Sequence, residues 1–327
     1  MILIVALNPA LDITHHVPSV DWSGVNRPVA VAARPGGKGL NVARTLRAIG
    51  AEVCVVGLVG GVTGEGVRSA LSDLAIPAAF TPIRAETRRT FAVVDGRRGG
   101  TALFNEPGPA VDAGEYGGFC VQYKSTLADC AAVVLSGSLP PSLPADTYAQ
   151  LSDMATAAGV PVLLDAHGEA LRLGAAAGPA IVKPNLAELE GLASHGLSTP
   201  RGVDLAAVAA AAGALRATGP AAVVVSLGAD GLLACTGDGD WLAVPPADVP
   251  GNPTGAGDAV AAGLVHGLAT GQPWAERLRH AVALGTASAA APVAGEFRQA
   301  DYAALVPQVT VSRAGAGRAG AGRMGAS

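Results

Sequence analysis

The chain has 327 residues, of which 50 % are hydrophobic and 15 % are charged, and its formal net charge is −4. This composition excludes an intrinsically disordered protein and is typical of a globular chain that can bury a large core. No basic face stands out, which argues against nucleic acid as a main partner. Four scattered cysteines without Cys-x-x-Cys spacing indicate neither a zinc site nor a disulfide framework.

The N-terminal residues predict a strand and not a targeting segment. Residues 1–5 are apolar but carry no basic region, and Asn8, Pro9 and Asp12 follow soon after. No apolar run reaches about 18 residues, so the sequence predicts no membrane span. We therefore expect a cytoplasmic enzyme.

Strand-like and helix-like patterns then alternate along the chain. Continuous apolar runs predict buried strands over residues 2–7, 53–57, 132–135, 160–164, 180–182 and 221–226. Apolar residues at helical spacing predict helices over 40–49, 67–74, 205–215 and 259–268. Such alternation indicates a doubly wound α/β fold, with a mostly parallel sheet flanked by helices and joined by right-handed crossovers.

Two stretches, residues 12–33 and 87–104, do not fit a parallel sheet. The second is typical of a hairpin, because Asp-Gly and Gly-Gly pairs interrupt two apolar runs. We assign both stretches to a small β-sheet lid on a domain of residues 1–310. The Arg-, Gly- and Ala-rich residues 311–327 are expected to form a disordered tail.

A Gly-rich segment precedes the last of these predicted helices and ends in a carboxylate, as Thr254-Gly255-Ala256-Gly257-Asp258. The first turn of a helix leaves backbone N–H groups unpaired at its positive end, and small residues let an anion approach them. Asp258 would repel that anion, unless it takes a proton from a hydroxyl that attacks phosphorus. The alternative is an ordinary helix start with a capping carboxylate.

A second Gly-rich segment, Gly36-Gly37-Lys38-Gly39, leads into the helix predicted at residue 40. It is not a P-loop, because Gly39 stands where that motif has Ser or Thr. It allows close approach of a small polar ligand, with Lys38 and Asn41 directed at it. The alternative is a tight strand-to-helix turn.

Two further segments follow predicted strands. Asn185 and Glu188 lie three apart, so they share one helix face and suit hydrated Mg²⁺ near phosphates, with Lys183 balancing charge. The alternative is a capped helix with a solvated acidic face. Residues 226–231 either pass beneath a nucleotide or form a hairpin. Asp165, at a predicted strand end, is given no role, and the histidines show no metal spacing.

Together the four segments resemble the PfkB (ribokinase-like) family of sugar kinases, up to about Leu305. The resemblance implies a ribokinase-like fold with ATP and Mg²⁺ as cofactors. It implies that Asp258 is the catalytic base and that Gly255, Ala256 and Gly257 form the anion hole. The implied ATP-binding residues are Lys183, Asn185, Ser226, Gly228, Gly231, Thr254, Gly255 and Gly257, and Glu188 would contact Mg²⁺ through water.

Within this family, residues 7–12, 104–109 and 136–141 look like the phosphosugar branch, which includes 1-phosphofructokinase, tagatose-6-phosphate kinase and the minor 6-phosphofructokinase. A substrate that already carries a dianion needs cationic side chains, and the predicted lid contains Arg27 and the Arg88-Arg89 pair. The implied substrate-binding residues are Asp12, Arg27, Gly37, Lys38, Asn41, Arg88 and Ser138.

The expected activity is phosphoryl transfer from ATP to fructose 1-phosphate, with tagatose 6-phosphate and fructose 6-phosphate as alternative acceptors. A Rossmann dehydrogenase is disfavoured because no Gly-x-Gly-x-x-Gly follows the first strand. A sugar-phosphate-binding regulator on an inactive kinase fold is a distant alternative. The expected partners are small molecules, with no nucleic acid and no membrane, and a second copy of the chain joined through the lid.

Overall fold

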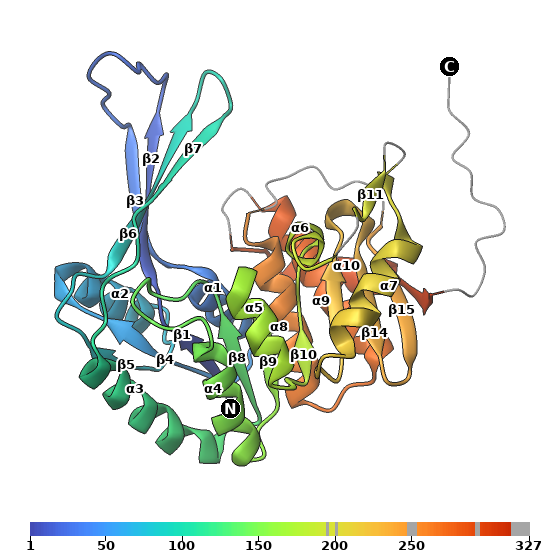
Figure 1. Ribbon diagram of the computed structural model, residues 1–327. Helices are drawn as coiled ribbons and strands as arrows, with labels where there is room; N and C mark the ends of the chain where they lie inside the picture. The colour runs from blue at the N-terminus through green and yellow to red at the C-terminus, as the bar shows by residue number, and fades with distance from the viewer. Residues whose placement is uncertain (194–195, 200–201, 247–253, 292–294, 315–327) are drawn as a thin grey trace, which may run out of the picture.

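The computed structural model describes residues 1–193, 196–199, 202–246, 254–291 and 295–314. Over this part of the chain, one large sheet dominates the molecule (Figure 1). Its ten strands lie in the order β16 (Thr310–Arg313), β15 (Gly239–Val244), β14 (Leu232–Thr236), β13 (Val223–Ser226), β10 (Ile181–Val182), β9 (Val162–Asp165), β8 (Ala132–Ser136), β1 (Ile2–Ala6), β4 (Val53–Val59) and β5 (Ala78–Pro82).

The strands from β13 to β5 run parallel, whereas β14, β15 and β16 are each antiparallel to their neighbours. Strand β1 lies inside the sheet, third from the β5 edge, where Val5 pairs with Val56 of β4 on one side and with Leu135 of β8 on the other. The chain therefore builds outward from β1 in both directions. The carboxyl ends of β1 and β8 meet at the point where ligands bind in doubly wound sheets.

Helices cover both faces of this sheet and enclose two separate cores. One face carries α1 (Lys38–Ala48), α2 (Gly61–Asp73), α8 (Ala256–Ala269) and α9 (Trp274–Ala290), and the other carries α3 (Ala113–Thr126), α4 (Thr147–Ala157), α5 (Gly168–Ala176) and α7 (Leu205–Arg216). Strand side chains alternate between the faces, so Ile4 joins the first core and Leu3 the second. Two shorter helices are α6 (Leu186–Glu190) and α10 (Gln299–Leu305).

The predicted lid is a separate sheet that projects from the main body (Figure 1). Its strands are β3 (Ala30–Gly36), β2 (Ala10–Val17), β6 (Arg88–Asp95) and β7 (Thr101–Asn105), in that order. The β6–β7 turn is held by Asp95, whose Oδ1 accepts hydrogen bonds from the backbone N–H groups of Arg97 and Arg98. The expected fold class, including the small lid, is confirmed. Strands β11 (Ser198–Thr199) and β12 (Gly202–Val203) pair antiparallel in a separate two-stranded sheet.

The C-terminal boundary lies later than expected. Strand β16 extends the large sheet, with Val311 opposite Ala243 of β15, so the first residues assigned to the tail belong to the sheet. Val311 packs against the core, and the Arg313 guanidinium lies 3.8 Å from the centre of the Trp241 ring. Residues 315–327 lie outside the described residues.

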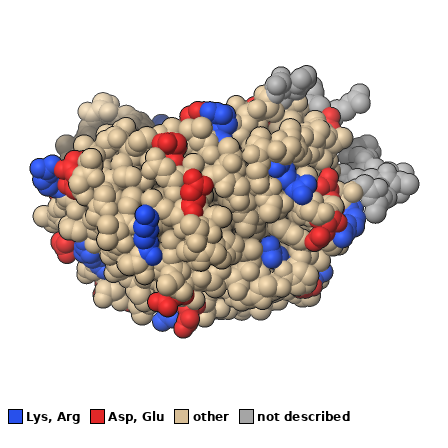
Figure 2. Space-filling model, turned by 60° about the horizontal axis from the view of Figure 1, so that its bottom comes forward, with Lys and Arg blue, Asp and Glu red and all other residues tan. Residues whose placement is uncertain are grey.

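Charged side chains are sparse on the face shown in Figure 2, where basic and acidic groups are interspersed and no large patch of one sign is visible. Within the described ranges, no helix is long and apolar enough to cross a membrane.

Candidate active site

The candidate site lies at the carboxyl edge of the parallel strands, where the chain leaves β1, β8, β9 and β10. Polar residues occupy these positions: Ser136 ends β8, Asp165 ends β9 and Lys183 follows β10. Helix α1 begins at the same edge, because the return strand β3 of the lid leads directly into it. The lid and the large sheet thus meet at this edge.

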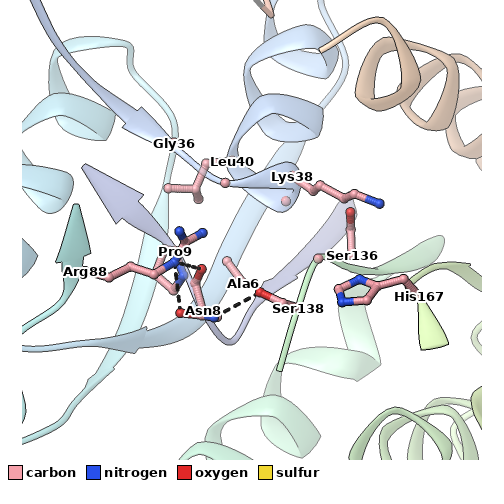
Figure 3. A pocket seen from close by; sticks show the side chains of 13 residues that line it. Ala6, Asn8, Pro9, Gly36, Lys38, Leu40, Arg88, Ser136, Ser138 and His167 are labelled. Atoms are coloured by element: carbon pink, nitrogen blue, oxygen red, sulfur yellow. Dashed lines mark hydrogen bonds between the residues drawn. The ribbon is translucent and has the colours of Figure 1, made fainter. Parts of the chain in front are cut away.

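A pocket of about 150 Å³ opens here. It is lined by Ala6, Asn8, Pro9, residues 36–40, Arg88, residues 136–138 and His167. Figure 3 shows Arg88 and Asn8 toward one end, and Lys38, Ser136 and His167 toward the other. Four predicted substrate residues, Gly37, Lys38, Arg88 and Ser138, therefore line one pocket, although they come from three distant parts of the chain.

Arg88 is held in place without being neutralised. Its Nε donates to the backbone oxygen of Asn8 at 3.3 Å and to Asn8 Oδ1 at 3.1 Å, while Asn8 Nδ2 donates to Ser138 Oγ at 3.0 Å (Figure 3). No ion pair joins Arg88 to any acid in the described part of the chain. Because Nε alone makes these contacts, the terminal nitrogens remain for an anion in the pocket.

The neighbouring residue Arg89 has a different environment. Its guanidinium pairs with Glu106, with 2.8 Å between Nη2 and Oε1, and it lies over the ring of Phe91. Successive side chains on a strand point to opposite faces, so Arg88 and Arg89 of β6 cannot both face the pocket. The predicted pair therefore reduces to one candidate, Arg88.

Asp12 and Arg27, the remaining lid candidates, do not line the pocket. Asp12 lies on β2 between Arg34 of β3 and Thr90 of β6. Burial raises the pKa of its carboxyl, while a hydrogen bond with Thr90 and the charge of Arg88 act in the opposite direction. Arg27 lies in the exposed connection between β2 and β3.

The Gly-rich segment that ends in Asp258 begins α8. Gly255 precedes the helix with φ +84°, in the left-handed region that favours glycine, and its carbonyl accepts from the N–H of Asp258 at 3.1 Å. The small residues Ala256 and Gly257 form the first turn, as an anion cradle requires. Thr254 directly precedes this turn, whereas Asn252 and Pro253 lie outside the described residues.

Asp258 is buried in this turn, with 7 % of its surface exposed. Its Oδ2 accepts a hydrogen bond from Asn41 Nδ2 of α1 at 2.8 Å. Burial, together with the nearby Asp165, raises the pKa of Asp258 to about 7, although Asn41 and two lysines act in the opposite direction. A carboxyl group with this pKa can take up and release a proton near neutral pH, as a general base must.

A cluster of charges connects this helix start with the pocket. Asp165 Oδ1 lies 3.2 Å from Lys38 Nζ and 3.3 Å from Lys183 Nζ, and the side chains of Asp165 and Lys183 are almost fully buried. A Cβ atom at Gly257 would lie 3.8 Å from Lys183 Nζ, so this ammonium group borders the anion cradle. Burial alone would lower the pKa of Lys38, but Asp165, Glu188 and Asp258 raise it above its usual value.

The Asn185–Glu188 element forms a capping box at the start of α6. Asn185 Oδ1 accepts from the N–H of Glu188, and Glu188 Oε2 accepts from the N–H of Asn185, each at 2.8 Å. Glu188 Oε1 lies 3.4 Å from Lys38 Nζ. The capped helix considered as the alternative is therefore present, and Glu188 also belongs to the charge cluster.

The described residues contain no group of three or more His, Cys, Asp or Glu side chains that could hold a metal ion. Yet Asp165 Oδ2 is buried and has no hydrogen-bond partner among the described residues. This donor set fits a Mg²⁺ ion held mostly by water and nucleotide phosphates, with Asp165 and Glu188 nearby, and not one enclosed by protein ligands.

The remaining predicted nucleotide residues lie beside this cluster. Asn185 and Ser226 form a parallel β-bridge, and the N–H of Ser226 donates to the carbonyl of Pro184 at 3.0 Å. After Ser226 the chain passes through a short 3₁₀ turn, Gly228–Asp230, and Gly231 into the antiparallel strand β14. The segment is therefore a hairpin, and its turn lies at the carboxyl edge of the sheet.

Sequence reasoning missed Asp165 and His167. Both Lys38 and Lys183 form ion pairs with Asp165. The position of Asp165 at the end of a buried strand is the sequence feature that points to a role at this edge of the sheet. His167 lines the pocket beside Ser136 (Figure 3). Its lack of metal spacing in the sequence is not informative about contact with a substrate.

Comparisons with known proteins agree with this geometry. Residues 5–299 match the sequence profile of the pfkB family carbohydrate kinases. Phosphofructokinase-2 from Escherichia coli, in complex with potassium, is 30 % identical with a TM-score of 0.87, and the match covers 94 % of this chain and 98 % of that one. A Thermotoga maritima protein described as a possible 1-phosphofructokinase is 26 % identical with a TM-score of 0.84, covering 96 % and 99 %. With its parallel sheet, lid and buried carboxylate at a Gly-rich helix start, the chain belongs to the PfkB family of carbohydrate kinases.

Proposed function

We propose that this kinase transfers the γ-phosphoryl group of ATP to the primary hydroxyl of a hexose phosphate, with fructose 1-phosphate as the first candidate acceptor and fructose 1,6-bisphosphate as the product. The observation that carries the proposal is the position of Asp258. Its carboxyl group is buried at the start of α8, directly after the small residues Gly255, Ala256 and Gly257. The helix start suits a phosphoryl group, and the carboxylate suits a hydroxyl that is to be deprotonated.

In the proposed reaction, Asp258 takes the proton of the acceptor's primary hydroxyl, and the resulting oxygen attacks the γ-phosphorus in line. The bond to the ADP oxygen breaks as the new P–O bond forms. Backbone N–H groups of Gly255, Ala256 and Gly257 stabilise the charge on the transferring group. Closure of the lid would exclude water and so limit hydrolysis of ATP.

The lysines support the nucleotide side of this reaction. Lys183 borders the anion cradle, and Lys38 lies between Asp165 and Glu188. Lys38 also lines the pocket with Arg88, so we propose that its ammonium group lies between the phosphate already on the acceptor and the transferring phosphoryl group. When Mg²⁺ is bound with ATP, it supplies further positive charge, and Asp165 and Glu188 are the residues that would hold its water shell. Asn185, Ser226, Gly228, Gly231 and Thr254 are proposed to surround the nucleotide.

Arg88 is the main support for a phosphorylated acceptor. Its guanidinium lines the pocket and forms no ion pair within the described ranges, and a sugar dianion would provide its partner. Gly37 and Ser138 line the same pocket, while Asp12 and Asn41 are proposed to hold sugar hydroxyls. A neutral sugar would leave this half-buried cation unpaired, which is costly.

A second acceptor is favoured by one of the comparisons. Another structure of the E. coli phosphofructokinase-2 contains fructose 6-phosphate and is 30 % identical to this chain with a TM-score of 0.84, covering 94 % of this chain and 98 % of that one. Fructose 6-phosphate and tagatose 6-phosphate therefore remain alternatives to fructose 1-phosphate.

The lid supports a homodimer. Three of its large apolar side chains are strongly exposed, Val29 (74 %), Val31 (60 %) and Phe104 (50 %), while the exposed Leu103 (55 %) lies on the opposite face of β7 from Phe104. A four-stranded lid of this kind is stabilised when another surface covers its apolar side chains. We propose that the lid of a second copy covers these side chains. In such a dimer, the exposed Arg27 of one copy would reach toward the pocket of the other. ATP and sugar phosphates are cytoplasmic metabolites, so we place the enzyme in the cytoplasm.

The decisive experiment measures ADP formation with fructose 1-phosphate, fructose 6-phosphate, tagatose 6-phosphate, free fructose or no acceptor. We expect turnover that depends on a sugar phosphate, with kcat/KM highest for fructose 1-phosphate and a bisphosphate as the product. Free fructose as the best acceptor would contradict the phosphosugar assignment. Binding of sugar phosphates without ADP formation would instead indicate a regulator on an inactive kinase fold.

A further inference from the structure

A row of polar contacts leads from the surface of the molecule to Asp258. It begins at Glu296, just before α10, whose Oε1 lies 3.3 Å from Nη2 of Arg44 on α1. Arg44 Nη1 donates to Asn41 Oδ1 at 3.4 Å, one helical turn earlier. Asn41 Nδ2 in turn donates to Asp258 Oδ2 at 2.8 Å. Residues far apart in the sequence are thereby joined to the proposed base.

These contacts require one particular orientation of the Asn41 side-chain amide. A side-chain amide has one accepting oxygen and one donating nitrogen, so it presents different chemistry to its two sides. In the observed sense, the nitrogen faces the Asp258 carboxylate and the oxygen faces the Arg44 guanidinium. Turning the amide over would place oxygen against carboxylate and nitrogen against guanidinium, so both contacts would become repulsive.

The Arg44 guanidinium can fix which of the two orientations the Asn41 amide adopts. Its side chain is 11 % exposed, and its two terminal nitrogens contact different partners, Asn41 and Glu296. The guanidinium never gives up its proton under ordinary conditions, so it can only donate to Asn41. A lysine at this position would keep the charge but would lack the rigid fork that contacts both partners at once.

Glu296 connects this arrangement to the lid. Its Oε1 also forms an ion pair with Arg34 of β3, so the lid, α1 and the segment before α10 meet at one carboxylate. Gly295 has φ +71°, and a Cβ atom there would lie 3.2 Å from Asn41 Oδ1 and 3.5 Å from Arg44 Nη1. The absence of a side chain at Gly295 lets this segment pack closely over the Asn41–Arg44 contact.

We infer that Arg44 is a positioning residue for the phosphoryl transfer: anchored by Glu296, it holds the Asn41 amide in the sense that donates to the catalytic carboxylate. This inference rests on the proposed role of Asp258 as base. One oxygen of that carboxylate is then occupied by Asn41, which leaves Oδ1 to receive the proton of the acceptor hydroxyl. Arg44 acts through Asn41 and has no contact with the reacting atoms.

The test compares the pH dependence of kcat in the wild type, Arg44→Met and Arg44→Lys. The pH at which kcat falls on the acid side of the profile, the acid limb, reports the protonation of the base and does not depend on the fraction of active protein. Asp165, Lys38 and Lys183, the other charged groups around Asp258, are unchanged in both variants. Without the donated hydrogen bond the carboxylate is less stabilised, so the limb should move up by about one pH unit in both.

Two controls separate orientation from charge. Arg47→Met removes a cation that lines the same surface crevice as Arg44, and it should leave the acid limb where it is. Arg44 also lies near Asp12 and Arg34, so loss of its charge alone would affect KM for the sugar phosphate. Restoration of the wild-type limb by Arg44→Lys would show that charge suffices, which would overturn the inference.

A double variant tests whether the effect passes through Asn41. In an Asn41→Ala background, adding Arg44→Met should not move the acid limb further, because the amide that Arg44 orients is gone. An equal shift in both backgrounds would overturn the inference. If Arg44→Met does not fold, Glu296→Gln takes its place. We expect this variant to move the acid limb in the same direction by a smaller amount, and an unchanged acid limb would contradict the inference.

Failure of this inference is distinguishable from failure of the proposed function. If Asp258→Asn keeps near-wild-type turnover, the assignment of the base is wrong and the positioning role falls with it. If Asp258→Asn is inactive while the acid limb is unchanged in Arg44→Met, the base stands and only the role of Arg44 is rejected.

Discussion

Lys38 Nζ lies 3.2 Å from Asp165 Oδ1, and this contact joins the first turn of α1 to the carboxyl end of β9. Lys38 also lines the candidate sugar pocket, whereas Asp165 pairs with Lys183 beside the anion cradle. The predicted sugar-binding segment around Lys38 and the predicted anion cradle before Asp258 are thus two parts of one charged site. We propose that an acceptor bound in the pocket lies against the ammonium group that also faces the transferring phosphoryl group.

The first prediction concerns Asp258→Asn. Asparagine keeps the shape of the side chain and can still accept from Asn41, but it cannot take up a proton from the acceptor. We expect KM for ATP to stay within about twofold and kcat to fall by roughly 10²–10⁴-fold, the usual contribution of a general base. Steady-state kinetics with the best sugar phosphate measures both, and near-wild-type kcat would remove Asp258 from the mechanism.

The wild-type enzyme should lose activity as the pH falls through neutrality. The pKa of Asp258 is raised to about 7, mainly by burial, so below this pH the group is protonated and cannot act as a base. Each pH unit below the pKa should lower kcat/KM by about tenfold, because kcat/KM reports the pKa of the free enzyme. A profile of kcat/KM between pH 5 and pH 9 measures this limb. A flat profile across neutrality would contradict the assignment.

Arg88→Ala should weaken binding of the sugar phosphate alone. Loss of one charge-assisted contact costs roughly 1.5–3 kcal/mol, so KM for the sugar phosphate should rise by about ten- to a hundredfold while KM for ATP stays nearly unchanged. Arg89→Ala is the matched control, because that neighbouring guanidinium is paired with Glu106 on the other face of β6. A larger effect from Arg89→Ala, or a rise in KM for ATP, would reject Arg88 as the phosphate contact.

Asp165→Asn should destabilise the fold as well as impair catalysis. Asp165 and Lys183 are almost completely buried, so the substitution leaves a buried ammonium group without its counter-charge. Breaking a buried ion pair typically costs on the order of 3–5 kcal/mol in the free energy of unfolding. Urea unfolding measures this loss, and Arg172→Gln, which breaks an exposed pair with Glu169, should cost much less. Equal losses would show that burial of the Asp165 pair is unimportant.

Assembly through the lid predicts that Phe104→Glu separates the dimer. A charge placed on a 50 % exposed phenylalanine of β7 would have to be buried against the second lid. Sedimentation velocity at micromolar concentration should show a dimer for the wild type and a monomer for this variant. Val121→Glu, on the exposed face of α3, should remain dimeric. A wild-type chain that sediments only as a monomer would reject the shared lid.

The order of strands and helices follows from the sequence itself, because apolar periodicity and helix capping depend on residues close together in the chain. The capping box of Asn185 and Glu188 shows this, since its two members are three residues apart and the sequence already predicts a capped helix there as one of two interpretations. The small residues before Asp258 likewise predicted a helix start open to an anion.

The partners of the buried charges depend on the tertiary structure. Asp165 had no assigned role because Lys38 is 127 residues away in the chain, and only the adjacent ends of α1 and β9 bring their charges together. Arg88 and Arg89 have the same charge and are neighbours in sequence, yet the packing of β6 directs only Arg88 into the pocket. Local periodicity encodes which face of an element is apolar, whereas the environment of each polar group is set by the elements that fold against it.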